Sequence, residues 1–276
     1  MFDEVIVGIA ADDTDRDAVA LGKELLSARG RLTLLHVLVV ANKPAPDSGA
    51  SGDAVKRRRA LERLEALADE SSVAAQVSCI DARSVRHGLH SFASSRHADL
   101  LVIGTSSPDD TAGMFVDDHT REVLDDAPCA VAVAPTGYAQ RVAGMRKIGV
   151  AYDGSAPSEQ ALVLGRSLAA DRQAEVSAFE AVRPPLLIHD TWDVEREIAG
   201  QAEDARRRIA TMTGVEAKAG SGGAADELAR YSDSVDLLVI GAHKYRPIDH
   251  LSDGSTAQQL AGRASSPLLV LPLRRR

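Results

Sequence analysis

Three short polar segments in the second half of the sequence could together bind an anion. They are Asp153-Gly154-Ser155 after one apolar run, Gly241 at the end of another, and Gly254-Ser255-Thr256 thirteen residues later, where a helix is expected to begin. A glycine lets backbone approach a ligand closely, and a helix N-terminus directs N–H groups at an anion. Asp153 is suited to accept hydrogen bonds from a ribose or a base amine, and Lys244 and Arg246 supply positive charge for phosphates. Together these residues indicate a nucleotide site.

Each of these segments also has a purely structural interpretation. Asp-Gly-Ser after a strand is typical of a turn that leads into a helix cap, and Gly-Ser-Thr before a helix is typical of a capping signal. Lys244 and Arg246 could be ordinary solvated surface residues. Only the joint placement of the segments at the ends of neighbouring strands favours the nucleotide interpretation.

An internal repeat indicates which elements position these residues. The hexapeptide DLLVIG occurs at Asp99–Gly104 and again at Asp236–Gly241, an offset of 137 residues. The same offset relates CAVAVAP, which begins at Cys129, to SPLLVLP, which begins at Ser266. Two copies of one domain explain this repeat. We therefore predict one domain over residues 1–140 and a second over residues 141–276.

Each copy is predicted to alternate strands with helices. In the second copy, strands are expected over residues 147–152, 175–182, 237–240 and 268–271 and near Val215, with helices over 156–170, 193–212 and 226–232 and from Ser255. Continuous apolar strands indicate a parallel sheet covered on both faces by helices. The predicted fold class is α/β, with two similar doubly wound five-stranded domains in tandem. Such sheets bind ligands beyond the carboxyl ends of the strands, where the strand order reverses.

The two copies resemble the universal stress protein family in its two-domain form, whose fold is adenine nucleotide alpha hydrolase-like. The segments that carry the resemblance are VAYDGSAPSEQAL, VDLLVIGAHK and DGSTAQQLAGRASSPLLVLP. The family loop G-x2-G-x9-G-S/T here reads Gly241-x2-Lys244-x9-Gly254-Ser255, so a lysine replaces the middle glycine. A glycine at this position would let the backbone approach the ligand closely and adopt a positive φ, which a lysine disfavours. The lysine ammonium group can instead form a charge-assisted hydrogen bond with the ligand.

The resemblance implies that the second domain binds ATP, with or without Mg²⁺. Asp153, Ala181 and Val182 would then surround the adenine, and the loop residues would lie around the ribose and phosphates. It also implies that the two domains pair through their last strands within one chain, while a homodimer stays open. The predicted nucleotide-binding residues are Ala151, Asp153, Gly154, Ser155, Ala181, Val182, Ile240, Gly241, Lys244, Gly254, Ser255 and Thr256.

The first copy lacks the same pattern. Its loop reads Gly104-x2-Ser107-x9-Asp117-Asp118, so carboxylates replace the Gly-Ser pair. Residues 109–126 contain seven acidic residues and one basic residue, Arg121. Each nearby carboxylate would repel a triphosphate by about 1–4 kcal/mol. We expect this domain to be structural and to bind no nucleotide, with a divalent cation at the acidic cluster as an alternative.

Composition narrows the class of function. The chain has 32 Lys and Arg against 40 Asp and Glu, a net charge of −8 and 3% aromatic residues, which argues against nucleic acid as a partner. No apolar run could span a membrane and no secretory signal is recognised, so we expect a cytoplasmic protein. No general base is evident beside a nucleophile. We therefore predict a stress-response nucleotide-binding protein with slow ATP hydrolysis at most. The alternatives are a nucleotide-free interaction module that has lost both sites and an adenylate-chemistry enzyme.

Overall fold

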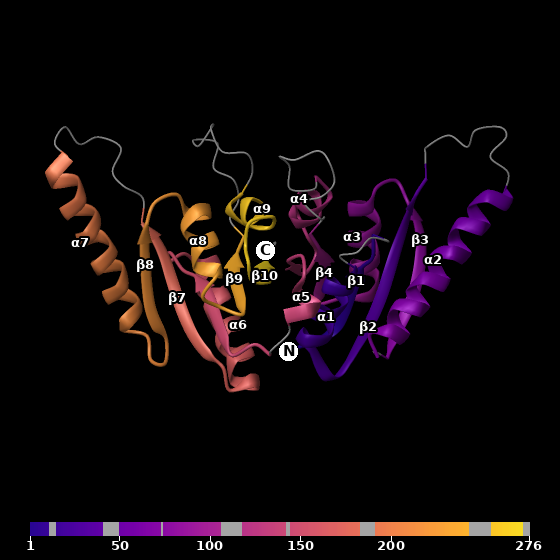
Figure 1. Ribbon diagram of the computed structural model, residues 1–276, viewed down its shortest axis with the longest axis horizontal. Coiled ribbons are helices and arrows are strands. Elements are labelled where there is room, and N and C mark those ends of the chain that lie inside the picture. Colours follow the sequence, from indigo (N-terminus) through magenta and orange to yellow (C-terminus); the bar gives the residue numbers. More distant parts are fainter. Residues whose placement is uncertain are drawn as a thin grey trace. The chain divides into compact units, whose positions relative to one another are not determined.

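The computed structural model describes residues 1–10, 15–40, 50–72, 74–105, 118–141, 144–182, 191–242 and 255–272. The chain divides into two compact units, Met1–Val142 and Ala143–Arg276. Within the described residues, each unit has five strands and its own set of helices (Figure 1).

The first unit follows the predicted order of elements. Its strands are β1 (Phe2–Gly8), β2 (Leu26–Val39), β3 (Ala75–Ala82), β4 (Leu100–Gly104) and β5 (Ala130–Ala134). Its helices are α1 (Asp15–Leu25), α2 (Ala50–Glu70), α3 (Val85–Arg96), α4 (Asp118–Leu124) and α5 (Tyr138–Arg141). The strands lie in the order β3-β2-β1-β4-β5, and neighbouring strands are parallel.

The second unit repeats this arrangement. Its strands are β6 (Lys147–Ala151), β7 (Glu175–Val182), β8 (Glu216–Ser221), β9 (Leu237–Gly241) and β10 (Leu268–Leu271). Its helices are α6 (Ala156–Arg172), α7 (Thr191–Ala210), α8 (Ala224–Ser232) and α9 (Thr256–Leu260). The strand order is β10-β9-β6-β7-β8, again with parallel neighbours. The predicted α/β fold with two doubly wound domains is confirmed.

Continuous apolar strands form the core of each unit. In β9, Leu237, Leu238 and Val239 have no exposed surface, and the repeated residues Leu100, Leu101 and Val102 of β4 have none either. Successive residues of a strand face opposite sides of the sheet. Burial of all three therefore requires cover on both faces, which α6 helps to provide by packing against β6 and β9.

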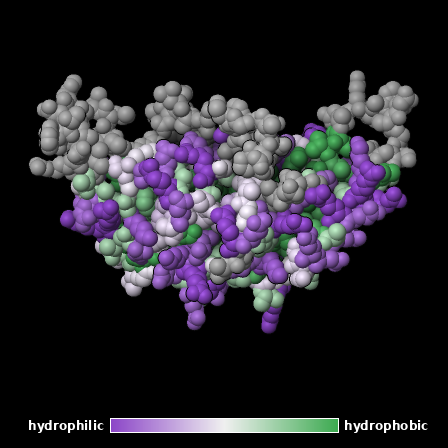
Figure 2. Space-filling view, in the orientation of Figure 1, coloured by the Kyte–Doolittle hydropathy of each residue, from purple (hydrophilic) through white to green (hydrophobic). Residues whose placement is uncertain are grey.

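The surface contrasts with this core. Figure 2 shows hydrophilic residues spread over the described part of the face in view, with hydrophobic ones between them. The large hydrophobic residues that are exposed within the described ranges are Met1, Val39, Val40, Val55 and Val163. No helix built from those ranges is both long and apolar enough to cross a membrane.

Candidate nucleotide site in the second unit

The strand order of the second unit reverses at β6. This strand pairs with β7 on one side and with β9 on the other. Val150 lies opposite Val239 in the β6–β9 register, and Ala151 and Ile240 are the next residues along these two strands. Both of these predicted site residues are buried, at 8% and 7% exposed. Their side chains belong to the core that holds the two strand ends in place, and they are not available at the surface to contact a ligand.

The segment Asp153-Gly154-Ser155 forms a tight turn between β6 and α6. The Asp153 carboxylate accepts a hydrogen bond from the Ser155 N–H at 3.0 Å. Ser155 caps α6, because its hydroxyl accepts from the N–H of Ser158 at 3.4 Å. Gly154 has φ +76°, a left-handed conformation that favours glycine. The turn-and-cap interpretation is therefore confirmed, while Asp153 and Gly154 still lie exposed at the carboxyl end of the sheet.

Gly241 brings the end of β9 against the start of α6. A Cβ atom at this position would lie 2.4 Å from the carbonyl oxygen of Pro157 and 2.5 Å from its carbonyl carbon. The close approach of the Pro157 backbone thus explains this glycine without a ligand. The same contact places the end of β9 beside the first turn of α6, whose cap is Ser155. The predicted convergence of these two strand ends is present.

Ser255 and Thr256 begin the short helix α9. The Ser255 hydroxyl accepts from the Gln258 N–H at 3.3 Å, and the Ser255 N–H donates to the Gln258 side chain at 2.8 Å. This capping box engages the N–H of Ser255 within the chain. Lys244 and Gly254 lie outside the described residues, so their part in the site stays a prediction.

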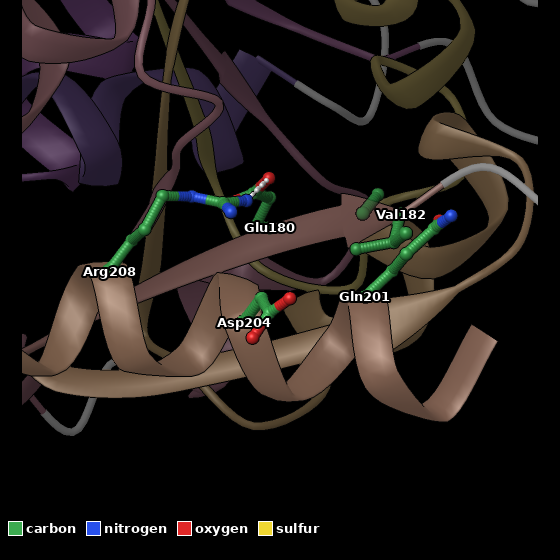
Figure 3. Close-up of a pocket in the computed structure, with 6 residues that line it drawn as sticks. Glu180, Val182, Gln201, Asp204 and Arg208 are labelled. Carbon is green, nitrogen blue, oxygen red and sulfur yellow. Dashed lines mark hydrogen bonds and ion pairs between the residues drawn. The ribbon is translucent and has the colours of Figure 1, made fainter. Parts of the chain in front are cut away.

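Ala181 and Val182 lie at the end of β7 and line an open groove of about 360 Å³ (Figure 3). Four polar residues line the same groove: Glu180, Gln201, Asp204 and Arg208. Figure 3 shows Gln201 and Arg208 extending from α7 toward β7, and the Arg208 guanidinium donates to a Glu180 carboxylate oxygen at 2.6 Å. None of these four residues was predicted from the sequence. The three residues on α7 share a spacing of three and four along one helix face, a pattern that is equally typical of a solvated face.

Tyr152, directly after β6, forms hydrogen bonds with both α6 and β7. Its hydroxyl donates to Glu159 on α6, and its backbone N–H donates to the Phe179 carbonyl oxygen on β7 at 2.9 Å. Burial, the hydrogen bond to Glu159 and the nearby charges of Glu159, Glu180 and Asp153 raise the pKa of Tyr152 to about 12. The phenol is therefore neutral at physiological pH, and three carboxylate residues lie near it.

In the first unit, two carboxylates in the first turn of α1 accept hydrogen bonds from backbone N–H groups. Asp15 is buried and accepts from the N–H of Ala10 at 2.9 Å. Asp17 is also buried and accepts from the N–H groups of Gly137 and Ala139, both at 2.7 Å. The loop residues Ser107 and Asp117 lie outside the described part of the chain. No group of three or more metal-binding side chains occurs among the residues that are described.

Comparisons with known proteins agree with this architecture. A universal stress protein from Archaeoglobus fulgidus superposes with a TM-score of 0.67 at 13% identity, covering 98% of this chain and 96% of its own. A putative universal stress protein from Pseudomonas aeruginosa gives a TM-score of 0.60 at 16% identity, covering 98% and 93%. At these identities the likeness shows the fold alone.

Sequence comparison identifies the family directly. A Thermus aquaticus protein, "Universal stress protein in QAH/OAS sulfhydrylase 3'region", is 29% identical over 139 residues, 48% of this chain and 97% of its own length. The model of the Universal stress protein family matches residues 1–135 and again residues 144–272. The chain therefore belongs to the universal stress protein family and contains two copies of its domain in tandem.

Proposed function

We propose that the second unit binds ATP beyond the carboxyl ends of β6 and β9, and that the first unit is a structural partner without a nucleotide. The observation that carries this proposal is the packing of Gly241 against Pro157 where the strand order reverses. It brings the exposed turn of Asp153 next to the strand end from which the Gly241-x2-Lys244-x9-Gly254-Ser255 loop departs. Ligands of doubly wound sheets bind at this position.

The described residues suggest how the nucleotide would be held. Asp153 is exposed and would accept hydrogen bonds from the ribose. Ala181 and Val182 line the groove into which the adenine would fit. Since the N–H of Ser255 serves the capping box, the phosphates would depend on the hydroxyls of Ser255 and Thr256 and on the Lys244 ammonium group. Any Mg²⁺ would then be held mainly by the phosphate oxygens.

The first unit differs in the groups that it offers. Its equivalent loop carries Asp117 and Asp118 in place of a Gly-Ser pair. The buried Asp15 and Asp17 accept backbone hydrogen bonds from their own unit. Negative charge at this position repels a triphosphate, which supports a structural role. Both cysteines of the chain are free, which suits the reducing cytoplasm that we propose as its location.

A nucleotide-free interaction module is the second candidate, and a specific observation favours it. Asp153 and Ser255 already form hydrogen bonds within the chain, so both segments are complete without a ligand. The carboxylates of Glu159 and Glu180 add negative charge beside Tyr152. If this charge outweighs Lys244, the second site is as inactive as the first.

Thermal melting with and without ATP separates the two candidates. ATP at a hundred times its Kd would stabilise the second unit by about 2.7 kcal/mol, which raises its melting temperature by several degrees. The Gly254→Asp variant should abolish this rise, because it places a carboxylate where the phosphates would bind. Glu175→Gln is the matched control, since Glu175 is exposed at the opposite end of β7. A wild-type melting temperature that ATP does not change at millimolar concentration would favour the nucleotide-free module.

A further inference from the structure

The groove between β7 and α7 contains a carboxylate oxygen that lacks a hydrogen-bond donor. One oxygen of Glu180 accepts from Arg208 at 2.6 Å. The other oxygen, Oε2, is buried and has no hydrogen-bond partner in the described part of the chain. The whole Glu180 side chain is only 14% exposed. A buried acceptor without a donor is costly, so a donor supplied by a ligand would be favoured.

The position of this acceptor suggests which donor it meets. Glu180 precedes Ala181 and Val182 on β7, and all three residues line the same groove (Figure 3). The proposed function places the base of the nucleotide against Ala181 and Val182. A planar base in this groove would present its ring edge to a carboxylate that Arg208 holds in a fixed orientation.

We propose that Glu180 recognises the 6-amino group of a purine base and thereby selects adenine over 6-oxo purines, an inference that rests on the proposed function. The amino group of adenine carries two hydrogens and can donate one to Oε2 of Glu180. A 6-oxo purine presents a carbonyl oxygen at that position. Two acceptors would then face each other with no hydrogen between them, which polar binding sites reject strongly.

Two other charged residues of the groove have different roles. Arg208 neutralises Glu180 and uses one oxygen, which leaves Oε2 as the acceptor for a ligand. The Asp204 side chain is 65% exposed, so water can hydrate its carboxylate whether or not a base is present. Asp204 therefore contributes little to the choice of base, although it lies in the same groove. This contrast supplies a matched control.

The test compares ATP with inosine triphosphate, which share their phosphates and ribose and differ at position 6 of the base. Titration calorimetry on the full chain should show ATP binding at least ten times more tightly than inosine triphosphate. In Glu180→Gln the amide can still accept from Arg208 and can donate to the inosine carbonyl, so the ratio should fall below about three. Asp204→Asn should keep the wild-type ratio.

A measurement on the wild type makes the test independent of how the variant folds. Purine riboside triphosphate carries a hydrogen at position 6, and it should bind at least ten times more weakly than ATP. Equal binding of this analogue and ATP, or an unchanged ratio in a folded Glu180→Gln variant, would overturn the role of Glu180 while ATP binding stands. Absence of ATP binding to the wild type would instead refute the proposed function, and this inference with it.

Discussion

Gly241→Ala should destabilise the second unit through a steric clash that can be estimated from the structure. The new Cβ would lie 2.4 Å from the carbonyl oxygen of Pro157 and 2.5 Å from its carbonyl carbon, whereas ordinary contact begins at 3.4 Å. The clashing atoms belong to the backbone of the first turn of α6, so they cannot rotate away as a side chain could. Overpacking of this kind costs about 1–3 kcal/mol. We expect the free energy of unfolding to fall by that amount.

Urea unfolding of three glycine variants isolates the steric cause. Gly200→Ala lies within α7, where the added methyl meets no described atom within 4 Å, and it should stabilise by about 0.5–1 kcal/mol. Gly154→Ala also meets no described atom within 4 Å but has φ +76°, so it should cost about 1–2 kcal/mol through backbone strain alone. A Gly241→Ala variant as stable as the wild type would refute the packing argument. If that stable variant lost nucleotide binding, Gly241 would serve the ligand rather than the fold.

Three further predictions concern residues away from the proposed site. Burial raises the pKa of Tyr231 to about 12, so its phenol ionises first in the unfolded state, and stability should fall by about 2 kcal/mol as the pH rises from 10 to 12. Tyr231→Phe should remove this loss in urea unfolding at alkaline pH, and an unchanged pH dependence would contradict the prediction. Burial lowers the pKa of His90, which donates to the Val123 carbonyl oxygen at 2.9 Å, so stability should decline as the pH falls below about 6.5. His90→Gln should reduce that decline, and an identical slope would count against it. Asp17→Asn keeps one acceptor for two N–H groups and should cost about 1–3 kcal/mol at pH 7, whereas unchanged stability would show that the caps contribute little.

The strands that the sequence predicted best are those buried on both faces. The apolar runs at 237–240 and 268–271 coincide closely with β9 and β10. The strand expected near Val215 is instead β8, Glu216–Ser221, at the edge of its sheet. Its sequence EAKAGS has no apolar run, because an edge strand is only partly buried. The helix expected from Asp226 begins earlier, at Ala224, because two alanines of high helix propensity join Asp226 and Glu227 in its first turn.

The candidate site was predictable where the local sequence determines the geometry. Turn and cap preferences placed Asp153 and Ser155 correctly at the end of β6, and Ser255 correctly at the start of α9. The contact between Gly241 and Pro157 depends on how a strand end and a helix pack, which no local pattern encodes.

The groove was missed for a related reason. Gln201, Asp204 and Arg208 lie on a helix that is rich in charged residues throughout, so nothing in the sequence distinguishes them from a solvated face. The packing of α7 beside β7 brings them into one groove with Glu180, to which Arg208 donates a hydrogen bond.

Titration calorimetry of nucleotide-free protein with ATP tests the central claim most directly. The second unit is proposed to bind and the first is not, so the expected stoichiometry is one ATP per chain. Gly254→Asp should reduce that value to zero, while Glu175→Gln should leave it at one. Two equivalents of ATP per chain, or no heat of binding at all from the wild type, would contradict the account.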